Sequence, residues 1–172
     1  MKTKVILIML VAALISCTEK LDIKPSDTVD SGTAASSSKD IEALLVGAYT
    51  LLGNGDVLGG NMQRDSELIG DDGEIFWDGT FVDPGQIYIK QMLITNGQAE
   101  ETWLESYEAI NTANAVLANI DIITDDKRDR VEGEAKFLRG LLYFELVRVY
   151  AKTYIDGTPS SNPGLPLVLT PN

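Results

Sequence analysis

The chain has no histidine and only one cysteine, Cys17, among its 172 residues. A single cysteine cannot form a disulfide within the chain, so packing must stabilise the fold. A catalytic thiolate needs a base beside it, and a zinc site needs several cysteine, histidine or carboxylate ligands at set spacings. The sequence around Cys17 shows neither pattern, which leaves an attachment point or an incidental thiol.

Basic residues are also scarce. There are 14 lysines and arginines against 26 aspartates and glutamates, so the formal net charge is −12. Binding to nucleic acid is led by Lys and Arg neutralising phosphates, and this composition therefore argues against a nucleic-acid partner. It argues equally against electrostatic adsorption to anionic lipid.

The amino terminus has the pattern of an export signal. Lys2 and Lys4 precede the uncharged run VILIMLVAALIS, an order typical of a signal peptide over residues 1–16. This run of twelve residues is too short to span a hydrocarbon core of about 30 Å, which takes roughly 20 residues of helix. We therefore interpret it as a targeting segment and not as a transmembrane helix.

The end of this signal resembles the lipobox of bacterial lipoproteins. Leu14, Ile15 and Ser16 stand directly before Cys17, and in such proteins cleavage before the cysteine accompanies acylation of its sulfur and of its new amino group. We expect Cys17 to carry covalent lipid, since stable anchoring takes more than one acyl chain and this cysteine would carry several. Ordinary secretory cleavage with an incidental thiol is the alternative.

Residues 17–38 are predicted to be the lipidated cysteine and a flexible tether, because they are polar and end in a run of small residues. The pattern changes at residue 39, where apolar residues recur at helical spacing up to the sequence Gly-Asn-Gly at 53–55. The stripe consists of Ile41, Leu44, Leu45, Ala48 and Leu52. Residues 56–96 lack a clear period, and we interpret them as mainly loop.

Two longer helices are predicted after this segment, one beginning near Gln98 and one ending near Ala151. A short connection makes them antiparallel neighbours. The first carries a stripe that we expect in the core, with its amide bonded to a neighbouring element: Trp103, Tyr107, Ile110, Asn114 and Leu117.

The last helix is the most apolar, so we expect most of its surface to be covered. Gly133 and Gly140 share a face that another helix could approach closely, and Arg139 would need an acidic partner. Four aromatic residues are expected mainly in the core: Tyr143, Phe144, Tyr150 and Tyr154. The later sequence LPLVL suits a short strand or an extended segment.

The sequence IFWDGTF at 75–81 suggests a ligand site in the irregular segment. Sugar sites combine flat aromatic faces with polar groups for the hydroxyls. Phe76, Trp77 and Phe81 supply such faces, with Trp77 the best candidate, and Asp71, Asp72, Glu74 and Asp78 lie among them. The alternative is that Phe76 and Phe81 are loop anchors in the core.

The acidic residues in this segment do not form a recognisable catalytic or metal motif. Asp71 and Asp72 are adjacent, whereas glycosidase carboxyls face each other across a sugar at about 5 to 9 Å. DDGE lacks the alternation of an EF-hand loop, so a calcium site is possible but unsupported. A solvated acidic loop is the simpler interpretation, and we expect no catalytic residues and no metal.

Five blocks follow one another along the chain: LDIKP after the cysteine, DIEALLVGAYTLL, WLESYEAINTANAVLANI, EAKFLRGLLYFELVRVYA and GLPLVL. In this order they resemble the amino-terminal part of the SusD/RagB family of outer-membrane nutrient-binding lipoproteins. Members of that family are about three times longer, so this chain resembles their first third. Gly140 and Lys152 depart from the family's usual residues without disturbing the likeness.

The resemblance implies an all-α fold of tetratricopeptide-like helix pairs over residues 39–172, with a loop-rich segment carrying the ligand site. It implies a non-enzymatic lipoprotein of the cell outer membrane, exposed at the surface. Such a protein binds a glycan or a peptide and delivers it to a SusC-like TonB-dependent transporter. A membrane-anchored helical-repeat adaptor that binds only proteins is the alternative, and a hydrolase is a third possibility.

Overall fold

A computed structural model of the chain describes residues 35–70 and 73–172. The predicted signal peptide, Cys17, most of the tether, Asp71 and Asp72 lie outside these residues. The described residues contain α-helices and no strand, which confirms the all-α prediction. The helices are α2 (Ser38–Leu52), α3 (Asn61–Ile69), α4 (Val82–Tyr88), α5 (Gly97–Ala118) and α6 (Arg128–Tyr150), with short 3-10 turns η1 (Ile120–Ile122) and η2 (Pro159–Ser161).

The helix predicted from residue 39 is α2, and its start is fixed by a side-chain cap. The Ser37 hydroxyl accepts a hydrogen bond from the backbone N–H of Asp40 at 3.3 Å and donates to its carboxylate at 2.7 Å. Such a cap satisfies donors that the first turn of a helix leaves unpaired. The predicted apolar face is buried at Ile41, Leu45 and Ala48.

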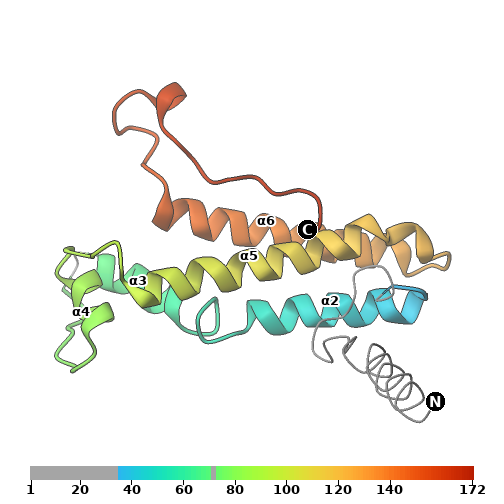
Figure 1. The fold of residues 1–172 in the computed structure, drawn as a ribbon, viewed down its shortest axis with the longest axis horizontal. Coiled ribbons are helices and arrows are strands. Elements are labelled where there is room, and N and C mark those ends of the chain that lie inside the picture. The colour runs from blue at the N-terminus through green and yellow to red at the C-terminus, as the bar shows by residue number, and fades with distance from the viewer. Residues whose placement is uncertain (1–34, 71–72) are drawn as a thin grey trace, which may run out of the picture. The chain divides into compact units, whose positions relative to one another are not determined.

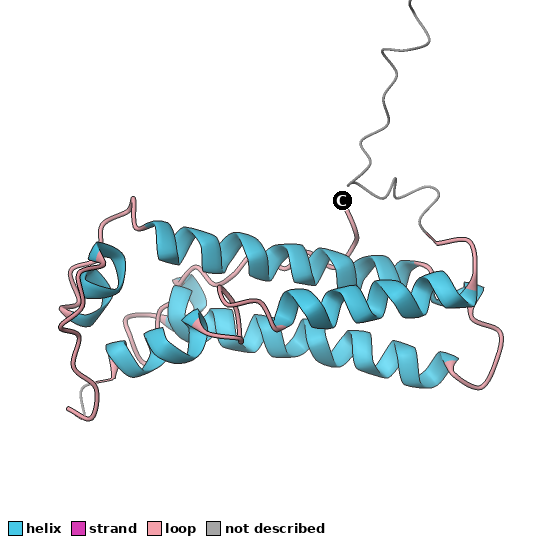
Figure 2. Cartoon of the chain, turned by 90° about the horizontal axis from the view of Figure 1, so that it is seen from below, coloured by secondary structure: helices cyan, strands magenta, loops and turns pink. Residues whose placement is uncertain are grey.

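Helices α5 and α6 are the two predicted long helices, and they run antiparallel with η1 in the connection between them (Figure 1). Within the unit formed by residues 35–172, α2 lies beside both (Figures 1 and 2). One core cluster joins all three helices and buries Ile41, Val116 and Leu138. Apolar burial of this kind contributes roughly 25 cal/mol per Å² and is the main force holding the helices together.

A second core cluster lies where the loop after α2 meets α5 and α6. Val57, Ile110 and Leu146 are fully buried in it. Half-buried aromatic rings surround this cluster, with Trp103 centred 4.8 Å from Tyr107 and 5.1 Å from Tyr150. The stripe predicted on α5 is therefore in the core, as expected.

Residues 56–96 contain α3 and α4, two short helices that the interpretation as mainly loop missed. Helix α3 buries Asn61 and Asp65 beside Met62 and Leu68. Because polar residues take half of its buried positions, the apolar period that marks a helix is absent. Helix α4 has seven residues and contains Pro and Gly, which sequence patterns associate with turns.

The carboxy-terminal residues run back along the helix pair as an extended segment without strand pairing, as one of the two alternatives for LPLVL predicted (Figure 1). Side chains of α5 and α6 hold its backbone. Tyr107 donates to the carbonyl of Pro166 at 2.8 Å, and Asn114 donates to that of Val168 at 2.9 Å. The Tyr143 hydroxyl donates to the same carbonyl at 2.9 Å and accepts from the Val168 N–H at 2.7 Å. Asn114 thus bonds across elements, as predicted.

The structure contradicts the expectations that most of the α6 surface is covered and that Phe144 and Tyr154 lie in the core. The outer face of α6 is not covered by described residues, since Phe137 and Phe144 are 64% and 58% exposed. Nothing lies within 4 Å of a side chain built at Gly133 or Gly140. Tyr154, beyond the helix, is 81% exposed. Tyr143 and Tyr150 do pack against the core.

Arg139 has no acidic partner among the described residues. Its guanidinium donates to the Asn114 side-chain carbonyl at 2.9 Å and to the Leu169 backbone carbonyl at 3.4 Å. Neutral oxygens satisfy this cation because its side chain reaches the extended carboxy-terminal segment.

Candidate functional site

An open pocket of about 410 Å³ lies among the loop between α2 and α3, α3 itself, the start of α4 and the start of α5. Its floor and walls come from elements that are far apart in the sequence, so the fold is needed to assemble it. The lining residues are Asp56, Asn61, Arg64, Phe81, Val82, Asp83, Pro84, Gly97, Gln98 and Glu101.

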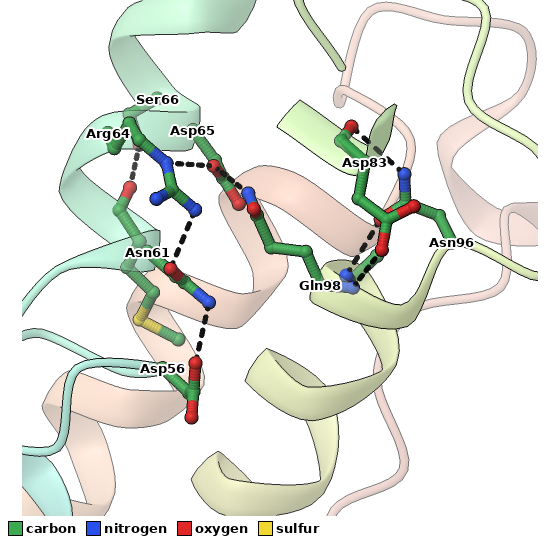
Figure 3. A network of polar contacts seen from close by, with 10 residues as sticks. Asp56, Asn61, Arg64, Asp65, Ser66, Asp83, Asn96 and Gln98 are labelled. Atoms are coloured by element: carbon green, nitrogen blue, oxygen red, sulfur yellow. Dashed lines mark hydrogen bonds and ion pairs between the residues drawn. The ribbon is translucent and has the colours of Figure 1, made fainter. Parts of the chain in front are cut away.

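One wall of the pocket is held by hydrogen bonds that begin in the loop after α2 and cross α3 (Figure 3). Asn61 donates from its amide to Asp56 at 2.9 Å, and its carbonyl accepts from Arg64 Nη2 at 2.7 Å. Arg64 Nε lies 3.5 Å from Asp65 Oδ1. Because Arg64 is tied to its own helix on both sides, its guanidinium is held in place before any ligand arrives.

The opposite wall ties the start of α5 to α4 (Figure 3). The carboxylate of Asp83 accepts from the backbone N–H of Gln98 at 3.3 Å. Asn96 caps α5 by accepting from the Ala99 N–H at 3.0 Å, and its amide donates to the Asp83 carbonyl at 3.1 Å. The positive end of the α5 dipole is thus occupied by side chains of the protein itself.

Gln98 joins the two walls, because its side-chain amide donates to the buried carboxylate of Asp65. Asp65 is 6% exposed. Burial raises the pKa of this carboxyl, and the Gln98 hydrogen bond and the Arg64 charge oppose that rise. Burial also raises the pKa of Tyr150 to about 12, with a smaller contribution from the charge of Asp65.

The rim of the pocket is aromatic and acidic. Phe81 is 74% exposed, and Glu101 near the start of α5 is exposed as well. The exposed ring can stack on the apolar face of a sugar, and the fixed carboxylates and guanidinium beside it can hydrogen bond the sugar hydroxyls. The sequence suggested this combination of aromatic rings and polar groups, but it did not indicate the pocket in which they lie.

Of the predicted ligand contacts, the structure brings only Phe81 into this pocket among the described residues. Phe76 and Asp78 are exposed elsewhere on the 73–81 loop, and Asp72 lies outside the described residues. The alternative in which Phe76 and Phe81 are core anchors is wrong, because their exposed fractions are 76% and 74%.

The anchor of this loop is Trp77. Its ring is partly buried and lies against Gly79 and Gly85, where a side chain built on Gly79 would come within 2.7 Å of the ring. Its indole N–H is buried without a hydrogen-bond partner among the described residues. Small residues at 79 and 85 let the largest ring of the loop turn inward and leave the two phenylalanines outside.

No local sequence pattern marks most of the polar pocket, including Asp56, Arg64, Asp83 and Gln98. Glu101 carries a weak signal, since acidic residues near the start of a helix suit its dipole. No group of three or more acidic or cysteine side chains in the described ranges could hold a metal ion. No helix there is both long and apolar enough to cross a membrane.

These observations define a class, namely an all-helical binding domain with an open polar pocket and an aromatic rim. A SusD-like family, described as "Starch-binding associating with outer membrane", matches residues 20–170. The match covers most of the chain, which therefore belongs to this SusD-like family.

Two curated relatives come from Formosa agariphila. "SusD-like protein P2" is 28% identical over 90% of this chain and 31% of its own length. "SusD-like protein P25" is 26% identical over 85% of this chain and 29% of its own length. The chain thus spans about a third of the length of these relatives. No solved structure matched the chain significantly.

Proposed function

We propose that this chain binds glycan at the pocket between α3, α4 and α5, as part of a lipid-anchored protein at the cell surface. Phe81 carries the proposal, because it is a large exposed ring beside a preorganised set of carboxylates, amides and a guanidinium. The family description, which names starch and the outer membrane, supports the same function.

The binding test compares two exposed phenylalanines. We expect Phe81→Ala to weaken binding of a glucan oligomer to the full chain by roughly two- to tenfold, since stacking of this kind contributes about 0.5–1.5 kcal/mol. Phe137→Ala, at a ring on α6 that is 64% exposed, should leave affinity unchanged. Isothermal titration calorimetry measures both, and equal affinities for the two variants would contradict the proposed site.

We extend the proposed ligand site along the 73–81 loop to Phe76, Trp77 and Asp78. Asp72 remains a predicted contact. Phe76→Ala tests this extension because the ring is 76% exposed and its removal should not disturb the fold. We expect a smaller loss of glycan affinity than for Phe81→Ala. If Phe76→Ala has no effect, the ligand site ends at the pocket.

We also propose that Cys17 is lipidated and that the protein delivers its ligand to a SusC-like TonB-dependent transporter without hydrolysing it. Cys17→Ser should abolish palmitate labelling and release the protein from outer membranes. Affinity purification of the lipidated chain should recover the transporter. An assay for reducing-sugar release should show no activity on glycans that bind.

A second candidate function is a membrane-anchored adaptor that binds only proteins. It is favoured by the open face of α6, where Phe137, Phe144 and Val147 are 64%, 58% and 42% exposed. Glycan titration separates the two functions. A glycan-binding protein should bind at least one glycan and lose affinity in Phe81→Ala, whereas an adaptor should bind none of the glycans tested.

A further inference from the structure

The charge of the pocket is unbalanced. Asp56, Asp83 and Glu101 contribute three carboxylates to its lining, and Arg64 is the single cation among the lining residues. The buried carboxylate of Asp65 stands directly behind that cation, 3.5 Å from its Nε. A ligand in the pocket therefore meets more negative than positive groups at close range.

Some of the groups that proteins normally use to bind anions are engaged in the pocket walls. Arg64 donates from Nη2 to Asn61 at 2.7 Å and makes no other side-chain hydrogen bond among the described residues. The first turn of α5, where an anion would otherwise find free N–H groups, is capped by the Asp83 carboxylate at 3.3 Å and by the Asn96 side-chain carbonyl at 3.0 Å. An incoming carboxylate or sulfate could therefore pair only with the part of the Arg64 guanidinium that Asn61 does not use, or would have to displace one of these groups.

Hydrogen-bond acceptors are more numerous. Glu101 is exposed and makes no hydrogen bond or ion pair within the described part of the chain. Asp56 uses one carboxylate oxygen for the Asn61 amide, and an ionised carboxylate has about four acceptor positions in total. A lining with three carboxylates and one guanidinium suits a ligand that brings its own donors, such as hydroxyl or ammonium groups.

We propose that this pocket selects glycans without anionic groups and rejects uronate and sulfated glycans, with Glu101 as the main exposed determinant. The inference rests on the proposed function, because it names the class of glycan that the same pocket accepts. Phe81 supplies affinity for the sugar ring whatever the charge of the sugar, whereas the carboxylates select among sugars by their charge.

The test uses the full chain and three oligosaccharides of matched length: a glucose oligomer, a galacturonate oligomer and a glucosamine oligomer. Titration calorimetry at low salt should show the galacturonate oligomer binding at least roughly tenfold more weakly than the glucose oligomer, by Coulomb repulsion across a partly desolvated site. The glucosamine oligomer should bind at least as tightly as the glucose oligomer. Both differences should shrink between about 20 mM and about 500 mM NaCl, because salt screens exposed charges.

Glu101→Gln supplies the matched variant, with Glu100→Gln as its control. Both glutamates are exposed near the start of α5, but only Glu101 lines the pocket. We expect Glu101→Gln to improve galacturonate binding relative to glucose binding by roughly threefold or more, whereas Glu100→Gln leaves that ratio unchanged.

The outcomes separate the two proposals. Binding of the galacturonate oligomer as tightly as the glucose oligomer would overturn the charge selection and leave glycan binding at the pocket intact. Equal effects of the two glutamate variants would remove Glu101 as the determinant. If none of the three oligosaccharides binds, the proposed function fails and the selectivity fails with it.

Discussion

Asp65 carries a carboxyl group that is 6% exposed, on the wall between the pocket and Tyr150. Burial raises its pKa above the ordinary value, so the folded state disfavours its charged form. The stability that Asp65 contributes is therefore present below its unfolded pKa and is lost as the pH rises through the raised folded pKa.

Asp65→Asn should accordingly make the protein more stable than the wild type near pH 7, because asparagine keeps an acceptor for Gln98 and has no charge to bury. The advantage should shrink as the pH falls to about 4 and the wild-type carboxyl becomes protonated. Urea unfolding at both pH values measures this difference. An advantage of the variant that grows on acidification would show that the Arg64 charge outweighs burial.

Trp77 and Phe76 are neighbours with opposite environments. Trp77 packs against Gly79 and Gly85, while Phe76 is 76% exposed. We predict that Trp77→Ala lowers the free energy of unfolding by about 1–3 kcal/mol, and that Phe76→Ala changes it by less than about 0.5 kcal/mol. Chemical denaturation followed by circular dichroism compares the two variants, and equal losses would place both rings in the fold.

Sequence patterns located the aromatic loop, but the alternative that makes Phe76 and Phe81 core anchors is wrong, because both rings are exposed. Composition favours tryptophan for stacking on sugars, and it says nothing about which ring the backbone turns inward. That choice depends on the two glycines that leave room for the indole of Trp77. The ligand contacts of Trp77 and Phe81 remain predictions.

At the level of elements, the carboxy-terminal segment depends on side chains of α5 and α6 because it has no strand partner. Tyr143 both donates to and accepts from Val168. We predict that Tyr143→Phe speeds hydrogen exchange of the Val168 amide by roughly tenfold, because a typical hydrogen bond contributes about 0.5–1.5 kcal/mol. Phe144→Leu, at the adjacent exposed position, should leave that exchange rate unchanged, and mass spectrometry can follow both.

The loop between α2 and α3 brings two stretches of backbone close together at Gly59. A side chain built on Gly59 would lie 2.2 Å from the backbone oxygen of Gly53, whereas nothing lies within 4 Å of one built on Gly55. Gly59→Ala should cost about 1–3 kcal/mol of stability through overpacking against backbone. Gly55→Ala should be close to neutral in the same unfolding measurement, and a similar loss at both positions would indicate a general need for chain flexibility.

The long helices were predictable because α2, α5 and α6 each bury one apolar face, and burial at Ile41, Ile110 and Leu138 follows the helical period. Helix α3 was not predictable, since it buries the polar residues Asn61 and Asp65, and the carboxylate of Asp65 accepts from Gln98, which is distant in sequence. A pocket built by such long-range polar contacts leaves no local period. The same reason hid Asp83 and Gln98 from sequence reasoning.

At the level of the whole molecule, the exposed face of α6 is the largest disagreement between the expected and observed burial. The apolar sequence of α6 predicts that most of its surface is covered, yet Gly133, Phe137, Gly140 and Phe144 face open space among the described residues. The chain spans about a third of its curated relatives. The sequence pattern shows which faces of a helix are apolar enough to be buried, and the described residues cover only part of the apolar surface of α6.

This face gives a prediction about the chain on its own. Replacing Phe137 and Phe144 together by Gln should change the free energy of unfolding by less than about 1 kcal/mol, because neither ring is buried and glutamine is a good helix former. It should also reduce self-association, since exposed apolar patches promote it. Leu142→Ala, on the buried side of the same helix at 1% exposure, should cost about 2–5 kcal/mol.

Unfolding curves and light scattering at several concentrations separate these effects. If the double variant loses as much stability as Leu142→Ala, the outer face of α6 is covered within this chain in solution. Unchanged stability with less self-association would instead show that α6 presents an apolar surface that the rest of residues 35–172 leaves open. The core of this helix and its outer face would then have separate roles, the first in folding and the second in contact with another surface.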